Sequence, residues 1–212
     1  MKKNSNSIIV IMVVLLGACQ PSVPEELPFF NSLDLEPEWI SISDSRFTRI
    51  HKVGPFSFID QDSMTITNKD FDGHVYVTDF FFTTCPSICP KMTDNMLSLQ
   101  EKYHNTEKLK LLSHTVTPWI DDVSRLKEYA EEKGVVSGKW HLVTGDQDEI
   151  YSQARLSYFV EGLMGIQRED DFLHTENFVL VDAKRRIRGL YSGTSKKEMK
   201  RLFRDLDILL EL

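Results

Sequence analysis

Two cysteines four positions apart are the residues of this chain best suited to chemistry. They lie in the segment Thr84-Cys85-Pro86-Ser87-Ile88-Cys89-Pro90, between a run of β-branched and aromatic residues and a helical pattern. A thiol at such a turn is close to the backbone N–H groups that begin a helix, and these groups stabilise the thiolate. Thiolates attack disulfides and bind soft metal ions, so the pair indicates a redox site or a metal site.

The spacing of the pair is compatible with a copper site and with a disulfide-exchange site. Cys-x3-Cys is one residue longer than the Cys-x2-Cys of ordinary thiol oxidoreductases, and it lets both sulfurs face one point while still permitting a disulfide. Two thiolates and an imidazole suit a monovalent copper ion, whereas zinc requires a fourth ligand for a closed site. A non-functional interpretation is that both cysteines are buried and only fill the core, and the proline after each cysteine argues against it. A plain disulfide-exchange site is the competing interpretation.

Strand and helix patterns alternate from Val53 onward, which predicts one α/β domain. We expect strands at 56–59, 64–66, 75–82, 109–112, 140–143, 178–181 and 187–191. We expect helices after the cysteines, after Pro118 with a stop at Gly134, at 147–156 and from a capping box at 195–198. This order resembles the thioredoxin fold, with a central mixed sheet flanked by helices, an N-terminal β-hairpin and insertions.

The N-terminal residues 1–18 have the layout of a secretory signal. Lys2 and Lys3 precede the uncharged stretch from Ile8 to Ala18, which is too short to span a bilayer because that takes about 20 residues. The following Leu16-Gly17-Ala18-Cys19 resembles the bacterial lipobox, in which the chain is cut before the cysteine and the thiol is diacylated. We therefore expect a lipid on Cys19 that anchors the protein to the cell membrane, facing the periplasm or the cell exterior.

The segment 19–50 is predicted to be a Pro-rich tether, and 51–212 the thioredoxin-like domain. Four prolines interrupt any regular element in the tether, and acidic residues keep it solvated; the prolines are Pro21, Pro24, Pro28 and Pro37. No internal repeat and no second domain are expected.

The composition is that of a soluble globular protein. Hydrophobic residues make up 41% and charged residues 27% of the 212 positions, which excludes a disordered chain, a collagen-like repeat and a multi-span membrane protein. The net charge is -7 and no basic stripe is present, which argues against a nucleic-acid partner.

The cysteine segment resembles the signature of the Sco/SenC family of copper-binding proteins. Three further segments match the family in the right order, namely Gly54-Pro55-Phe56, Trp140-His141-Leu142-Val143-Thr144-Gly145 and His174-Thr175. The family usually has Asp-Pro after the third strand, where this chain has Thr117-Pro118, and the missing carboxylate bears on the surroundings of the site. The resemblance implies a copper chaperone whose partner is the cytochrome c oxidase subunit that carries the copper A site. It also implies contacts with other copper chaperones or thiol reductases.

Among the six histidines of the chain, His174 is the strongest candidate for a third ligand. In thioredoxin-like enzymes the loop before the late hairpin packs beside the cysteines and carries a cis-proline. This chain has no proline after Pro118 and places His174 in that loop. Losing the proline removes an element that orients a substrate peptide, and the imidazole adds a ligand. We predict that Cys85, Cys89 and His174 hold copper, as Cu(I), Cu(II) or both.

Two weaker candidates lie nearby. His114 ends the strand beside the cysteine-bearing one, where it could support the ligands, but a plain strand-end histidine is the favoured interpretation. Met92 lies one turn beyond Cys89, and its place in an apolar stripe favours core packing over a thioether ligand. A thiol–disulfide reductase that keeps the client's copper-binding cysteines reduced is the alternative function. A redox or copper sensor is a third, so the question of enzyme activity stays open.

Overall fold

The computed structural model describes residues 26–160 and 175–211, which form an α/β domain around a seven-stranded sheet. The strands are β1 (Ser57–Asp60), β2 (Thr65–Thr67), β3 (Val75–Phe81), β4 (Leu109–Thr115), β5 (Trp140–Thr144), β6 (Asn177–Val181) and β7 (Ile187–Ser192). The α-helices are α1 (Cys89–Lys102), α2 (Val123–Lys133), α3 (Gln147–Ser152) and α5 (Lys196–Glu211). Shorter helical turns are η1 (Ser45–Arg49), η2 (Asn68–Phe71) and η3 (Gln153–Ser157).

The sheet has a parallel centre and antiparallel edges, in the strand order β2-β1-β5-β4-β3-β6-β7. β3, β4 and β5 run parallel, whereas β1–β2 and β6–β7 are the two predicted hairpins. Phe81 at the end of β3 pairs with Thr115 at the end of β4. The loops that follow these two strands therefore leave the sheet at the same edge, which is where ligand sites of α/β proteins gather.

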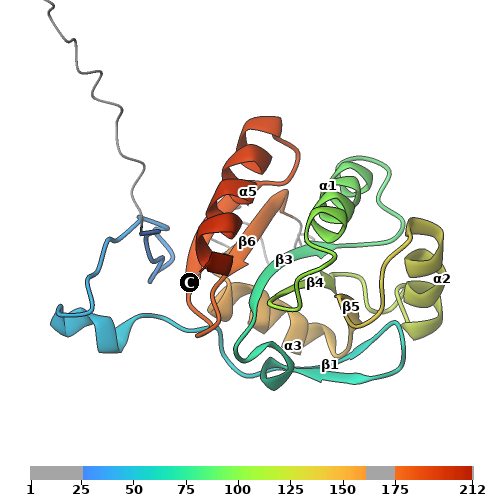
Figure 1. The fold of residues 1–212 in the computed structure, drawn as a ribbon. Helices are drawn as coiled ribbons and strands as arrows, with labels where there is room; N and C mark the ends of the chain where they lie inside the picture. The colour runs from blue at the N-terminus through green and yellow to red at the C-terminus, as the bar shows by residue number, and fades with distance from the viewer. Residues whose placement is uncertain (1–25, 161–174, 212) are drawn as a thin grey trace, which may run out of the picture.

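Helices cover both faces of the sheet (Figure 1). α1, α2 and α5 pack on one face, against strand residues such as Val77 and Leu111. α3 and η3 pack on the other face, against residues such as Tyr76 and Leu112. Neighbouring residues of β3 and β4 thus point to opposite layers, and both layers are apolar, which is why these strands appear in the sequence as continuous apolar runs. The predicted mixed sheet flanked by helices is confirmed.

The helix termini show where charge overrides a sequence signature. The predicted capping box at Ser195 forms only in part, because the Ser195 hydroxyl accepts a hydrogen bond from the Glu198 N–H at 3.4 Å while the Glu198 carboxylate pairs with Arg201. At another helix start, that of η2, a complete capping box forms between Thr67 and Asp70. A carboxylate is stabilised more by a guanidinium group one turn away than by a neutral backbone N–H.

The expectation of a solvated tether is wrong for the described part of that segment. Leu27, Phe29, Phe30, Ile40 and Ile50 are buried, and a β-bridge joins Phe29 to Glu38. The Phe30 N–H donates to the Ile187 carbonyl at 3.1 Å. The Arg188 guanidinium donates to the carbonyls of Leu27 and, at 2.9 Å, Pro28. The prolines do prevent long elements, but the apolar residues between them have a sheet edge to pack against.

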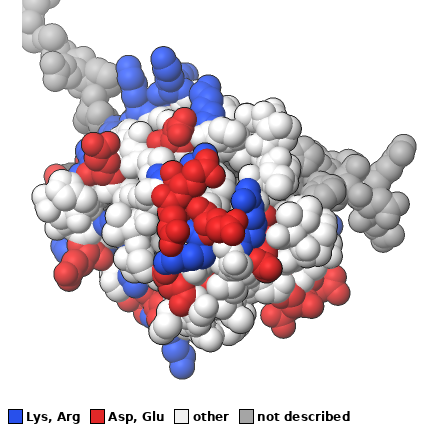
Figure 2. Space-filling model, turned by 90° about the vertical axis from the view of Figure 1, so that its right-hand side faces the viewer, with Lys and Arg blue, Asp and Glu red and all other residues white. Residues whose placement is uncertain are grey.

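The surface mixes charges of both signs. Figure 2 shows the side of the molecule that carries α2, and its Lys and Arg side chains are interspersed with Asp and Glu, without a continuous basic area. Two ion pairs of α2 are Lys127–Glu131 and Lys133–Glu132. Within 26–160 and 175–211, no helix combines the length and apolar character needed to cross a membrane.

His114 lies in the core, enclosed by aromatic rings. Its side chain is fully buried, its imidazole stacks on Phe80 with 4.9 Å between ring centroids, and Phe58 meets it edge-on at 5.6 Å. The hydrogen-bond partner of Nδ1 is the Thr78 hydroxyl at 3.2 Å, and Nε2 has no partner among the described residues. Burial lowers the pKa of His114 to about 3, because the aromatic surroundings disfavour the charged imidazolium.

This histidine predicts a specific loss of stability in acid. A histidine in the unfolded chain has a pKa near 6.5, so it binds a proton below that pH. In the folded protein, His114 stays neutral down to about pH 3. The free energy of unfolding should fall by about 1.4 kcal/mol per pH unit through this group. Urea denaturation between pH 7 and pH 4 measures how the free energy of unfolding falls with pH. In His114→Phe this fall should be less steep than in the parent, by the slope that corresponds to one proton. The exposed His104→Gln variant is the control, and equal slopes for all three proteins would contradict the assignment.

Candidate metal centre

The two cysteines lie at the turn between β3 and α1. Cys85 is partly exposed and Cys89, the first residue of α1, is 4% exposed. Both are free thiols. Pro90 follows at a position where a helix has an unpaired N–H in any case, so the proline costs no helical hydrogen bond and helps α1 to begin here. The sequence prediction of a strand-to-helix turn is confirmed.

The thiols face a hollow of about 490 Å³ with a mostly apolar wall. Its lining consists of Phe80, Phe82, Cys85, Pro86, Ser87, Ile88, Cys89 and Thr175. Thr175 lies two residues before β6, so the cysteine turn and the chain immediately before β6 meet at this hollow. An apolar wall lowers the local dielectric constant, which strengthens the interaction of a soft cation with a thiolate.

The two thiols are electrostatically unlike. Partial burial acts to raise the pKa of Cys85, but a hydrogen bond from the Cys89 thiol and hydrogen bonds from the backbone N–H groups of Ser87, Ile88 and Cys89 outweigh it, so this pKa lies below the ordinary value. Burial, together with the hydrogen bond that the Cys89 thiol donates to Cys85, raises the pKa of Cys89 to about 12. Of the two thiols, Cys85 therefore loses its proton more readily, and Cys89 holds its proton more tightly.

A buried carboxyl group, Asp79, faces the same layer from within β3. Burial raises the pKa of Asp79 to about 7, although the Ser113 hydroxyl donates to it at 2.5 Å. The Trp140 indole N–H in turn donates to the Ser113 hydroxyl at 2.9 Å. Asp79 was not among the predicted site residues. The signal was present, because Asp79 is the one charged residue in the apolar run 75–82.

A second missed residue, Asp121, lies in the loop after β4. Its side chain is fully buried, and its carboxylate accepts hydrogen bonds from the hydroxyls of Thr83, Thr115 and Thr117 at 2.5, 2.5 and 2.9 Å. The Thr83 N–H donates to it at 3.1 Å. Thr117 replaces the expected aspartate, but its hydroxyl is hydrogen-bonded to the Asp121 carboxylate. A carboxylate is thus present beside the cysteine turn after all, supplied four residues later.

Of the other predicted site residues, two lie outside the described residues, namely Cys19 and His174. His114 does not line the hollow, although it stacks on Phe80, which does. Met92 is 1% exposed in the layer between α1 and the sheet, as its apolar stripe predicted. In the parts of the chain that the structure describes, no three His, Cys, Asp or Glu residues are grouped to hold a metal ion.

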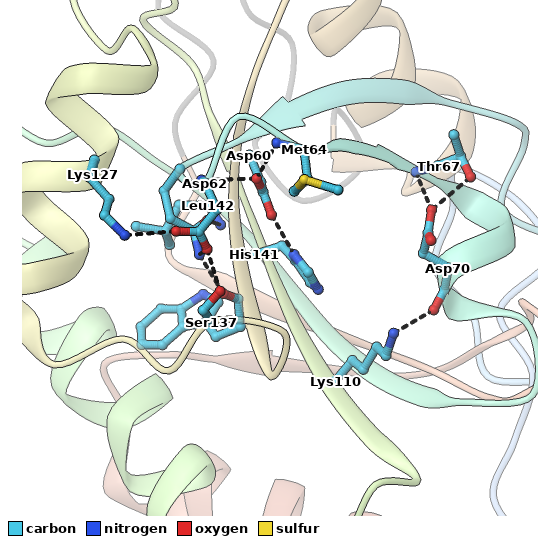
Figure 3. Close-up of polar contacts among 12 residues, drawn as sticks. Asp60, Asp62, Met64, Thr67, Asp70, Lys110, Lys127, Ser137, His141 and Leu142 are labelled. Carbon is cyan, nitrogen blue, oxygen red and sulfur yellow. Dashed lines mark hydrogen bonds and ion pairs between the residues drawn. The ribbon is translucent and has the colours of Figure 1, made fainter.

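His141, from the segment that matched the family, is engaged elsewhere (Figure 3). Its Nδ1 lies 2.9 Å from Oδ2 of Asp60, whose other oxygen accepts the N–H groups of Asp62 and Met64. The Asp62 carboxylate pairs with Lys127 of α2 at 2.7 Å. This polar group ties the β1–β2 hairpin to β5 and α2, and its residues are not among those that line the cysteine hollow.

Comparison with known proteins gives a consistent result. The SCO1/SenC family model matches residues 45–209. The SCO1 protein homolog of Bacillus subtilis is 29% identical over 144 residues, which is 68% of this chain and 75% of that protein.

Solved structures that resemble this chain also include Sco proteins. BsSco, described as a member of the Sco family of cytochrome c oxidase assembly proteins with a disulfide switch, has 28% identity and a TM-score of 0.65, over 77% of this chain and 95% of that one. Copper-bound ScoI of Arabidopsis thaliana shares the fold at 24% identity and a TM-score of 0.58, over 75% and 98% of the two chains. The predicted thioredoxin-like fold is confirmed by these neighbours.

The difference between the thiols predicts selective alkylation. At pH 7, a limiting amount of iodoacetamide should label Cys85 about tenfold or more faster than Cys89, because only the thiolate reacts and each pKa unit changes its fraction tenfold. Peptide mass spectrometry after brief exposure resolves the two sites. In urea the two rates should converge. Equal labelling of the folded protein would show that burial and the turn do not distinguish the thiols.

Proposed function

Because the chain belongs to the SCO1/SenC family, we propose that it is an extracytoplasmic copper chaperone that delivers copper to the copper A site of cytochrome c oxidase. The observation that carries this proposal is the Cys85–Cys89 pair at the wall of an apolar hollow. Two sulfur ligands select a soft ion such as Cu(I). In this proposal copper is the cargo, bound by Cys85, Cys89 and His174 and passed on to a client.

The donor set fits that cargo. The pKa of Cys85 lies below its ordinary value, and Cys89 must release its proton when it binds the ion, so copper affinity should rise with pH. Among the described residues, Cys85 and Cys89 are the two sulfur ligands that line the hollow. His174 precedes Thr175, and Thr175 lines the hollow; this adjacency supports His174 as the third ligand.

The proposed lipid on Cys19 would hold the domain close to a membrane. The Arg188 guanidinium fixes Leu27 and Pro28 to the domain by their carbonyls. Leu27 lies only eight positions after Cys19, and at about 3.5 Å per position this stretch reaches no more than roughly 28 Å. A short reach keeps the chaperone at the surface where a membrane-bound client presents its own copper site.

A thiol–disulfide reductase is the second candidate, and the unlike thiols favour it. A partly exposed thiol with a lowered pKa beside a buried thiol with a raised pKa suits attack on a client's disulfide by Cys85 followed by release through Cys89. This role would keep the client's copper-binding cysteines reduced. It requires Cys85 and Cys89 but no imidazole, so His174 distinguishes the two functions.

Copper titration of ligand variants tests the chaperone. Cys85→Ser should abolish tight Cu(I) binding, measured by competition with a chromophoric chelator. His174→Ala should weaken it by at least about 10–100-fold, the range found when support of a metal site is lost. His104→Ala, which changes an exposed histidine at the end of α1, is the matched control and should bind like the parent. Far-UV circular dichroism confirms folding. Unchanged affinity in folded His174→Ala would reject the proposed ligand set and favour the reductase.

Detergent partitioning tests the anchor. In a bacterial host that processes lipoproteins, the parent should enter the detergent phase because its acyl chains partition there, and Cys19→Ala should lose acylation and the associated mass increase. Mass spectrometry of the N-terminal peptide gives a second readout. An N-terminal peptide without lipid in the parent would contradict the proposed modification.

A further inference from the structure

Asp121 connects the cysteine turn to the neighbouring strand. Its four hydrogen bonds come from two sides, two from Thr83 on the turn after β3 and two from Thr115 and Thr117 at the end of β4. Thr83 lies two residues before Cys85. The carboxylate thus bridges the two loops that leave the sheet at the edge where the thiols lie.

We propose that Asp121 is a positioning residue whose buried carboxylate holds the turn that carries Cys85 against Cys89 at the start of α1. The inference rests on the proposed use of this pair as a dithiol. It assigns Asp121 no contact with copper and no role as a proton carrier.

The strength of these contacts supports a positioning role. Hydrogen bonds to a carboxylate are about twice as strong as those between neutral groups. Two of the hydrogen bonds to Asp121 come from Thr83, and both would break if Thr83 moved away. The Arg125 guanidinium of α2 donates to the Thr83 hydroxyl at 3.0 Å, which adds a third constraint on this residue. Beyond Thr83, the Cys85 N–H donates to the Phe82 carbonyl at 3.3 Å, so the start of the turn is fixed up to Cys85 itself.

A fixed turn changes the equilibrium between dithiol and disulfide. With oxidised glutathione, the two thiols lose two protons and two electrons, one S–S bond forms in the protein, and glutathione's S–S bond breaks to give two thiols. The equilibrium constant depends on how closely one thiol is held to the other. Loosening the turn lowers their effective concentration and hence disfavours the disulfide.

Two isosteric variants separate this effect from general stability. Thr83→Val and Thr117→Val each remove one hydroxyl donor from Asp121, but only Thr83 lies on the cysteine turn. The full chain with Cys19→Ala, in detergent, has Cys85 and Cys89 as its only thiols. Equilibration in glutathione buffers, with acid trapping and thiol labelling, gives the equilibrium constant for each variant.

We expect Thr83→Val and Asp121→Asn to lower this constant by tenfold or more, and Thr117→Val to change it by less than threefold. Asp122→Asn is a second control, because Asp122 caps α2 through the Arg125 N–H and should lower stability without moving the constant. Should Asp121→Asn fail to fold, the threonine pair still decides. Equal constants for Thr83→Val and Thr117→Val would overturn the proposal.

The outcome is independent of copper. The glutathione equilibrium is measured without metal, so a protein that binds no copper can still show the dependence on Thr83, and a copper chaperone can lack it. Failure of the copper titration and failure of this inference are therefore distinguishable.

Discussion

The parallel pairing of β3 with β4 is the constraint on which the site depends. It brings the ends of the two strands, Phe81 and Thr115, side by side. The cysteine turn and the loop of Asp121 consequently emerge at one edge, although 36 residues separate Cys85 from Asp121 in the chain. Because parallel strands need a crossover, α1 must follow at once, and its first residue is the second cysteine.

The different depths of the two thiols follow from this geometry. Cys85 lies in the turn, where one side faces the hollow, whereas Cys89 points into the layer that α1 buries against the sheet. Burial disfavours the charged thiolate at Cys89, and the backbone N–H groups of the turn favour it at Cys85. One pair thereby combines an available soft ligand with one that binds only on releasing its proton. Both copper binding and disulfide exchange can use that difference.

The N-terminal segment shows how far local signals reach. Its prolines indicated a lack of long elements, and within the described residues 26–50 the structure has only the short turn η1 and one bridge. They could not indicate that Phe29 and Phe30 would be buried, because that depends on the edge strand β7, more than 150 positions away. A tether predicted to run to residue 50 is thus docked from Leu27 onward.

The sequence by itself determined the local structure, that is, where the strands, helices and turns lie along the chain. Strand and helix positions, the turn at Cys85 and Cys89, the core place of Met92 and the fold class follow from periodicity, turn residues and apolar runs, which depend on near neighbours. Tertiary structure decided what those signals do not contain. Asp79 and Asp121 became part of the site's surroundings through contacts with Ser113 and Thr83, and His114 was placed among aromatic rings rather than at the hollow. Such contacts join residues more than 30 positions apart, and only the pairing of strands and the packing of layers brings them together.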